Sequence, residues 1–342
     1  MPRYPIIDLH EDISAYFIYF GGGEPFGDLK EDLPDRDADI PKYLRGNIKI
    51  VLSSIFPGIL TFKPSEYGRM RLAYGKWLPA IGYRVPQSII LEHFSIYYRL
   101  VEAYPELRIV ESLADVDNVM GRDDKVGLIL HMEGADPIDD PYDLVIFKRL
   151  GLRSIAITWN YNNKYGSGCM SRKDYGLTPD GEELVRMANK LGIIVDLAHA
   201  SKRTAIDAMQ VSTKPVIISH ANVRRFVDSP RNVDDEVLEA LHKNGGVIGV
   251  TFISSLISQK PKPTIDDLVQ HIMYIYERFG AGIIAIGSDF HGLLGLPKPE
   301  GLETIDKVQN LLEKLAEKGL GDNDLRKIAY ENALRVIKAN LT

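Results

Sequence analysis

Eight short runs rich in isoleucine and valine alternate with amphipathic stretches along this chain, and this alternation constrains the fold most strongly. The runs lie at residues 5–10, 49–56, 127–133, 154–159, 193–199, 216–220, 246–252 and 283–290. Continuous apolar runs of this length are typical of parallel strands that are buried on both faces. Strands that alternate with helices predict either a closed (β/α)8 barrel or an open, doubly wound sheet.

The segments between the runs carry helix signals. Helical periodicity is clearest over residues 139–150, 180–191, 201–209, 234–243 and 264–279. Ser201, Asp234 and Thr264 each precede a periodic run, where their side chains can cap the start of a helix. We also expect two terminal helices outside the barrel, at residues 302–318 and 322–339, and a long loop over residues 57–84 near the barrel mouth. Because no linker interrupts the pattern, residues 1–342 are expected to form one domain.

Polar residues close five of the apolar runs, in the segments IIDLHED, LHMEG, VDLAH, IISH and IGSDF. In a doubly wound sheet these strand ends would spread along a crevice. In a barrel the carboxyl ends of the strands converge on one mouth, where active sites of this fold lie. Since a metal site needs convergent ligands, we favour a (β/α)8 TIM barrel with additional C-terminal helices.

Five residues at these strand ends predict a metal centre. His10 and Asp12 are two residues apart, so an extended chain directs both side chains to the same side. His199 and His220 close two neighbouring strands, and Glu133 can bridge two cations through its two carboxylate oxygens. Imidazole and carboxylate ligands suit zinc, although manganese, iron and cobalt accept the same donors. We therefore expect two Zn²⁺ ions per chain, which in hydrolases hold a shared hydroxide and polarise the bond that it attacks.

Each of these residues also has a simpler interpretation. A single histidine at a strand end is more often a hydrogen-bonded core residue than a ligand. The combination of five such residues at strand ends is what favours a metal site. His131 shares a strand face with Glu133 and stays open as a further candidate. His242 and His271 lie in predicted helices and His93 in an amphipathic segment, so they are not expected to bind metal.

Composition and charge narrow the classes of partner. The formal net charge is −6, with acidic and basic residues mixed throughout, which argues against nucleic acid or an anionic membrane. Cys169 is the single cysteine, so the chain cannot form an intrachain disulfide. The N-terminal segment has no long apolar run, and no stretch approaches the roughly 20 apolar residues of a membrane span. We therefore expect a cytoplasmic protein.

These motifs together resemble the membrane dipeptidase (renal dipeptidase) family of metallopeptidases. The matching segments are IIDLHED, ILHMEGAD, LGLRSIAITWN, GLTPDGEELVRMANKLGIIVDLAHAS, KPVIISHANVR, RNVDDEVL, IAIGSDFHG and ENALRVI, in the family order. The resemblance implies a soluble, prokaryotic-type zinc barrel that hydrolyses free dipeptides. It also implies that His10 and Asp12 bind one zinc, that His199 and His220 bind the other, and that Glu133 bridges them.

The resemblance implies two roles that spacing could not show. Asp289, in the SDF segment, would take a proton from the bridging water and pass it to the leaving nitrogen. Arg231, in the PRN segment, would pair with the free carboxylate of the dipeptide, which a guanidinium can hold through two hydrogen bonds. From the residues alone, a structural aspartate and a surface arginine would be the expected interpretations.

The chain departs from the family pattern at two positions. Renal enzymes have a histidine after the threonine of the fourth strand, where it helps to hold the substrate carbonyl. Here Thr158 is followed by Trp159, which we expect to contact substrate and to alter the substrate range. His291 follows SDF, where many members have an acidic residue. The lipid-anchor signal and the paired cysteines of the mammalian members are absent, and dimers in the family make a homodimer one expected assembly.

Two alternatives to a dipeptidase stay open at this point. The first is another amide or lactone hydrolase that uses the same metal centre. The second is a barrel that binds metal or a small ligand without turnover. The complete set of candidate ligands speaks against the second alternative.

Overall fold

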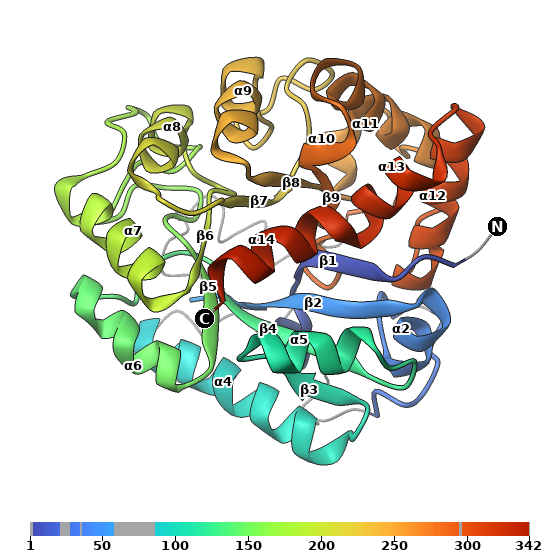
Figure 1. Ribbon diagram of the computed structural model, residues 1–342, viewed down its shortest axis with the longest axis horizontal. Coiled ribbons are helices and arrows are strands. Elements are labelled where there is room, and N and C mark those ends of the chain that lie inside the picture. Colours follow the sequence, from blue (N-terminus) through green and yellow to red (C-terminus); the bar gives the residue numbers. More distant parts are fainter. Residues whose placement is uncertain (1–2, 21–27, 35, 58–85, 294–295, 342) are drawn as a thin grey trace.

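A computed structural model describes residues 3–20, 28–34, 36–57, 86–293 and 296–341. Parallel strands form a closed ring in the order β2-β1-β9-β8-β7-β6-β5-β4, and pairing between β2 and β4 closes it (Figure 1). The ring comprises β1 (Ile6–Glu11), β2 (Ile48–Ile55), β4 (Val126–Met132), β5 (Leu152–Ala156), β6 (Ile194–Asp196), β7 (Ile217–Ala221), β8 (Val247–Val250) and β9 (Ile284–Ile286). The predicted (β/α)8 barrel is thus confirmed over the doubly wound sheet.

Each strand of the ring overlaps one predicted apolar run, but several strands end earlier than predicted. Strand β6 ends at Asp196 and β9 at Ile286, whereas the predicted runs continued to residues 199 and 290. The backbone explains the difference, because His199 and Asp289 have φ angles of 64° and 65°, which interrupt an extended strand. The polar residues therefore lie on the loops just beyond the strands.

Helices cover the outside of the ring (Figure 1). Four of them follow the predicted segments: α7 (Pro179–Leu191), α8 (Lys202–Val211), α9 (Asp235–Asn244) and α11 (Ile265–Phe279). The side chain of Ser201 accepts a hydrogen bond from the backbone of Thr204, and that of Asp234 accepts one from Val237, so these two predicted caps are present. The fifth predicted segment contains a 3-10 turn, η4 (Pro141–Asp143), followed by α6 (Leu144–Arg149).

Several elements were not predicted from the sequence. The first loop contains α1 (Ile13–Ala15), a π-turn η1 (Tyr16–Phe20) and α2 (Ile40–Gly46). Between β2 and β4 lie α4 (Pro86–Ala103), β3 (Leu107–Ile109) and α5 (Leu113–Met120), and β8 is followed by α10 (Ser254–Ile257). Strand β3 pairs with the first half of β4, outside the closed ring. The predicted loop over residues 57–84 lies almost entirely outside the described residues.

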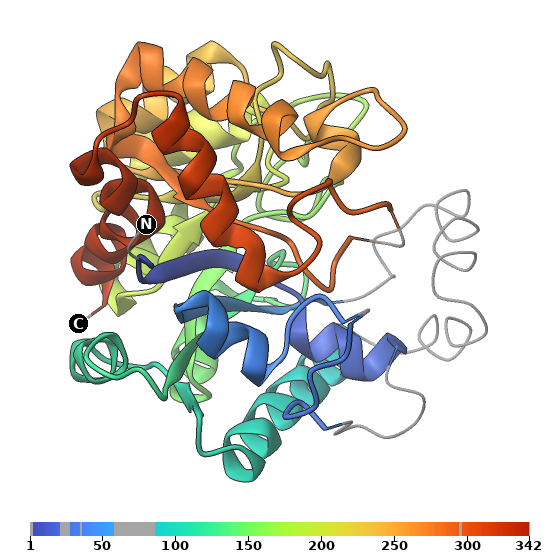
Figure 2. The same cartoon turned by 90° about the vertical axis from the view of Figure 1, so that its right-hand side faces the viewer.

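One of the C-terminal helices, α14, covers the amino-terminal end of the barrel. The C-terminal helices comprise η5 (Ala281–Ile283), which precedes β9, then η6 (Ile305–Lys307), α12 (Val308–Glu317), α13 (Asp322–Arg326), η7 (Lys327–Glu331) and α14 (Asn332–Asn340). Val336 and Ile337 of α14 belong to one buried cluster with Ile50, Ile129 and Ile217 from the strands. Figure 2 shows the last part of the chain (darkest red) at one end of the barrel. The prediction that both terminal segments pack outside is therefore refined, because α14 covers the base.

Among the described residues, no helix is both long enough and apolar enough to span a membrane.

Candidate metal centre

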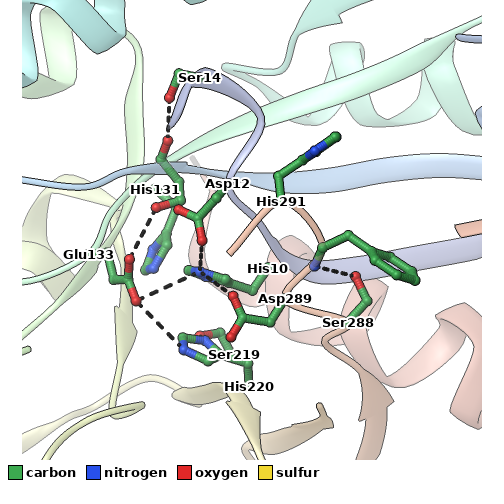
Figure 3. A network of polar contacts seen from close by, with 12 residues as sticks. His10, Asp12, Ser14, His131, Glu133, Ser219, His220, Ser288, Asp289 and His291 are labelled. Atoms are coloured by element: carbon green, nitrogen blue, oxygen red, sulfur yellow. Dashed lines mark hydrogen bonds and ion pairs between the residues drawn. The ribbon is translucent and has the colours of Figure 1, made fainter. Parts of the chain in front are cut away.

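Six polar side chains from five strand ends meet at the carboxyl end of the barrel. Most of them are drawn in Figure 3. Two of the six, His10 and His220, belong to strands β1 and β7. The other four belong to the loops that follow β1, β4, β6 and β9. The set is His10, Asp12, Glu133, His199, His220 and Asp289, and all six are buried. Asp12 is not extended as predicted but stands at the N-terminus of α1.

His10 and Glu133 lie at the centre of this group. The Nε2 atom of His10 is 3.6 Å from Asp12 Oδ2, 3.7 Å from Glu133 Oε1 and 3.7 Å from Asp289 Oδ1. On the other side, Glu133 Oε1 is 3.0 Å from His199 Nε2 and 3.6 Å from His220 Nε2. One carboxylate oxygen of Glu133 therefore faces all three histidines.

Among the residues that the structure describes, two groups of donor atoms are close enough to share a cation. One contains His10, Glu133 and His220, and the other contains His10, Asp12 and Asp289, with the donor atoms of each within 4.8 Å of one another. This grouping differs from the pairing that the resemblance implied, because His10 belongs to both groups. His199 belongs to neither, although its Nε2 atom lies against Glu133 and His220.

The buried nitrogens of this site fit a cation. Within the described part of the chain, neither ring nitrogen of His10 has a hydrogen-bond partner, although the side chain is fully buried. Leaving a buried polar group without a partner costs free energy, which a bound metal would offset. The Nε2 atoms of His199 and His220 also face each other at 2.9 Å. The Nδ1 of His199 contacts Asn160 Oδ1 at 2.7 Å, which leaves its Nε2 as the lone-pair nitrogen.

The pKa shifts of the site also favour the binding of a cation. Burial lowers the pKa of His199 and of His220 well below the usual range, and the positive charge of Arg231 adds to this effect. Burial alone would lower the pKa of His10, but Glu133, Asp12 and Asp289 raise it to about 10. Burial also raises the pKa of Asp289 to about 8, against the attraction of His10. The neutral rings of His199 and His220, next to crowded carboxyl groups, are suitable donors for divalent cations.

The backbone around the site adopts uncommon conformations and leaves room for two carboxylates. His199, Asp289 and His291 have φ angles of 64°, 65° and 65°, which are uncommon for residues other than glycine and tend to cluster at functional sites. At Gly292, an added Cβ atom would overlap with Asp12 Oδ2 and Asp289 Oδ1. Glycine at this position therefore allows the two carboxylates to approach the backbone.

Arg231 and Trp159 both lie beside His199. The Nη2 atom of Arg231 donates to the backbone oxygen of His220 at 3.1 Å. Arg231 and His199 also line a cavity of about 160 Å³ that includes Cys169. The ring of Trp159 lies 5.3 Å from the ring of His199 at an interplanar angle of 27°. The structure thus brings both predicted substrate residues to the edge of the candidate metal centre.

His131 and His291 lie outside the two donor groups. His131 Nδ1 is 2.9 Å from Ser154 Oγ, its Nε2 is 3.3 Å from Asp196 Oδ2, and its ring lies 5.5 Å from that of His10. The backbone nitrogen of His291 donates to Asp37, and its ring packs 4.9 Å from Tyr16.

The sequence did not indicate the polar residues that form hydrogen bonds with the candidate ligands. Ser54 Oγ donates to Glu133 Oε2 at 3.3 Å, Asn160 contacts His199, and Ser219 Oγ lies 2.8 Å from His220 Nδ1. Serine and asparagine are common at strand ends, so their identity gave no signal. Only Ser219, which directly precedes His220 in IISH, had a position that could have drawn notice.

Comparison with known proteins identifies relatives across the chain. A family model described as membrane dipeptidase, peptidase family M19, matches residues 1–341. The dipeptidase tcpJ of Claviceps purpurea is 32% identical over 253 residues, which cover 72% of this chain and 59% of tcpJ. The chain thus spans less than two thirds of that relative. An uncharacterised dipeptidase of Schizosaccharomyces pombe is 32% identical over 346 residues, which cover 99% of this chain and 81% of the relative.

Two solved structures show the same fold. One is the metallopeptidase dipeptidase AC, with a TM-score of 0.84 at 22% identity and coverage of 99% of each chain. The other is a metallopeptidase of Rhodobacter sphaeroides that is liganded with a phosphinate mimic of the dipeptide L-Ala-D-Ala. It has a TM-score of 0.84 at 22% identity and covers 99% of this chain and 100% of its own. At this identity, the likeness shows the barrel architecture alone.

Proposed function

This chain belongs to the membrane dipeptidase family, peptidase family M19, and from that premise we propose that it is a zinc-dependent dipeptidase. The proposed reaction is hydrolysis of the peptide bond of a free dipeptide. The observation that carries it is the meeting of buried carboxyl and imidazole groups around His10, whose ring nitrogens have no hydrogen-bond partner within the described residues.

The proposed metal ligands are those that the sequence indicated: His10, Asp12, Glu133, His199 and His220. Glu133 is proposed to serve both ions because its Oε1 atom faces His10 on one side and His199 on the other. When bound, two divalent ions supply an activated hydroxide and polarise the carbonyl under attack. The burial of the donor side chains excludes bulk water, which strengthens electrostatic interactions within the site.

Asp289 is the proposed general base and acid. Its Oδ1 atom lies 3.7 Å from His10 Nε2, so the carboxyl group reaches the same space as the ligands. In the proposed mechanism, a carboxylate oxygen of Asp289 accepts a proton from the attacking water. It then delivers that proton to the departing amine nitrogen.

Arg231 is the proposed anchor for the substrate carboxylate. Its side chain borders the cavity beside His199, and one of its nitrogens is held by the backbone of His220, which limits its motion. A guanidinium held beside the proposed metal ligands would select substrates that have a free carboxylate close to the scissile bond. Trp159 is proposed to contact the same substrate through its position against His199.

The replacement of a family histidine by Trp159 favours one alternative. If the carbonyl lacks a histidine donor, the substrate range could shift to other amides or to lactones. The test is to compare hydrolysis of free dipeptides, N-acyl amino acids and lactones by the zinc-loaded protein. Preference for dipeptides supports the proposal, whereas activity on the other two classes with none on dipeptides would replace it.

A further inference from the structure

A buried carboxylate lies directly behind His220, one side chain away from the candidate ligands. Asp196 is the last residue of β6, and Ser219 and His220 are neighbours in β7. Ser219 Oγ is 2.5 Å from Asp196 Oδ2 and 2.8 Å from His220 Nδ1. Asp196 and Ser219 are completely buried, and neither belongs to the two donor groups.

The hydrogen bonds of Asp196 have a defined direction. Its Oδ1 atom accepts from the backbone nitrogens of Ala198 at 2.9 Å and Ser219 at 2.8 Å. Its Oδ2 atom accepts the hydroxyl proton of Ser219. Because a serine hydroxyl has only one proton, Ser219 Oγ must act as an acceptor towards His220. The proton of the His220 ring therefore resides on Nδ1, and the Nε2 lone pair faces Glu133 Oε1 at 3.6 Å.

The charge on Asp196 is consistent with this direction. Burial alone would raise the pKa of Asp196, but hydrogen bonding to His131 and to the neighbouring donors outweighs it and lowers the pKa. An ionised carboxylate can only accept hydrogen bonds, so Asp196 cannot donate to Ser219 and reverse the direction of these hydrogen bonds. His199 differs, because its Nδ1 donates to the amide oxygen of Asn160.

We propose that Asp196 and Ser219 are positioning residues that fix the ring tautomer of His220, so that its Nε2 atom is available to the metal. The inference rests on the proposed metal centre. Groups behind a metal-ligating histidine orient the ring, and their loss typically weakens metal affinity by about 10- to 100-fold.

Asp196→Asn gives the sharpest test, because it preserves shape and changes only the donor pattern. The amide oxygen should take the Oδ1 position, where two backbone N–H groups point, so the amide nitrogen should face Ser219. That nitrogen donates to Ser219 Oγ, and the Ser219 hydroxyl then donates to His220 Nδ1. The variant should therefore favour the wrong tautomer. Ser219→Ala removes the hydroxyl that joins Asp196 to His220, without reversing the direction of the hydrogen bonds.

The measurements are the Zn²⁺ dissociation constant, from competition with a chelator, and ¹⁵N NMR of histidine-labelled, metal-free protein. We expect Nδ1 of His220 to be protonated in the wild type and unprotonated in Asp196→Asn, with zinc affinity lowered about 10- to 100-fold. In the Ser219→Ala background, adding Asp196→Asn should have little further effect, because the link is already cut. The matched control is Ser53→Ala, a buried strand serine whose hydroxyl donates to the backbone oxygen of Val51 and to no other residue that the structure describes.

Two results would overturn the inference. One is an Asp196→Asn protein that folds, keeps Nδ1 of His220 protonated and binds Zn²⁺ like the wild type. The other is an Asp196→Asn substitution that weakens zinc affinity equally in the wild type and in the Ser219→Ala background. That result would mean that Asp196 has a general packing role. A wild type that binds no zinc would instead contradict the proposed function, and the NMR result on metal-free protein separates the two failures.

Discussion

At the residue scale, the meeting of the candidate ligands at one end of the barrel could be predicted because these residues end apolar runs. His10, Glu133 and His220 each follow or close a strand, and the barrel geometry then brings such ends together. Ser219 and Asp196 could not be predicted, because their role depends on which atoms face each other across two strands. The direction of a hydrogen-bond chain is a property of three-dimensional contacts and leaves no spacing pattern in the sequence.

His199→Ala should lose metal. The Nε2 atom of His199 lies 3.0 Å from Glu133 and 2.9 Å from His220, so its removal deletes a proposed donor next to two other proposed ligands. Elemental analysis of purified, zinc-treated protein should show reduced metal per chain. His242→Ala is the control, because His242 is exposed in the last turn of α9 and should leave the metal content unchanged. Equal metal content in the two variants would remove His199 from the ligand set.

Asp289→Asn should keep its fold and metal but lose turnover. The amide cannot accept and return a proton, and loss of a general base typically costs about 100-fold or more in rate. Steady-state hydrolysis of a dipeptide by the zinc-loaded variant measures the effect, with metal content determined on the same sample. Near-normal kcat with full metal content would end the assignment of Asp289 as the base.

Changes at Arg231 should act on substrates that have a free carboxylate. Arg231→Lys keeps the charge but loses the forked pair of donors, so we expect a clear rise in KM for dipeptides. Arg231→Ala should cost about 2–5 kcal/mol in kcat/KM, which is typical when a buried charge pair is broken. A dipeptide amide should be a poor substrate of the wild type and should be little affected by either change. If the wild type cleaves the amide as well as the dipeptide, Arg231 is not the anchor.

At the element scale, the strands of the ring were predictable and several covering elements were not. The strands are continuous apolar runs, and such runs can be recognised from the local sequence without knowing which strands pair with each other. Strand β3 has three residues and lies outside the ring, so it carries too little periodicity to detect. Helix α4 was missed although it is long, because the sequence before it has no clear cap and merges into the segment rich in tyrosine, glycine and proline. The strand ends were overextended because the backbone turns at His199 and Asp289 have no simple sequence mark.

Helix α14 should contribute strongly to stability because it seals the base of the barrel. Ile337→Ala would leave a cavity against the apolar residues of the strands and should destabilise the protein by about 2–5 kcal/mol. Urea unfolding of the metal-free protein, followed by circular dichroism, tests this. Lys338→Ala, next to it on an exposed position of the same helix, should change the stability by less than about 1 kcal/mol, because it removes only an exposed ion pair with Asp117. Similar midpoints for the two variants would show that α14 does not stabilise the barrel.

At the scale of the whole molecule, function depends on the distribution of apolar and polar residues between the two ends of the barrel. The amino-terminal end is filled by isoleucine and valine under α14, and the carboxyl end gathers the histidines and carboxylates (Figures 1 and 3). One end therefore supplies stability and leaves the other to hold groups that are costly to bury. That division was implicit in the strand pattern, whereas the closure of the base by the chain's own C-terminus required the structure.

The most direct test of the account is a titration of metal-free protein with Zn²⁺ while dipeptide hydrolysis is measured. The substrates should be a mixed library of L-X-L-X and L-X-D-X dipeptides. We predict no hydrolysis without metal and activity that rises with bound zinc to a plateau at about two ions per chain. Protein that holds two ions per chain and cleaves no dipeptide of either series would contradict the central claim.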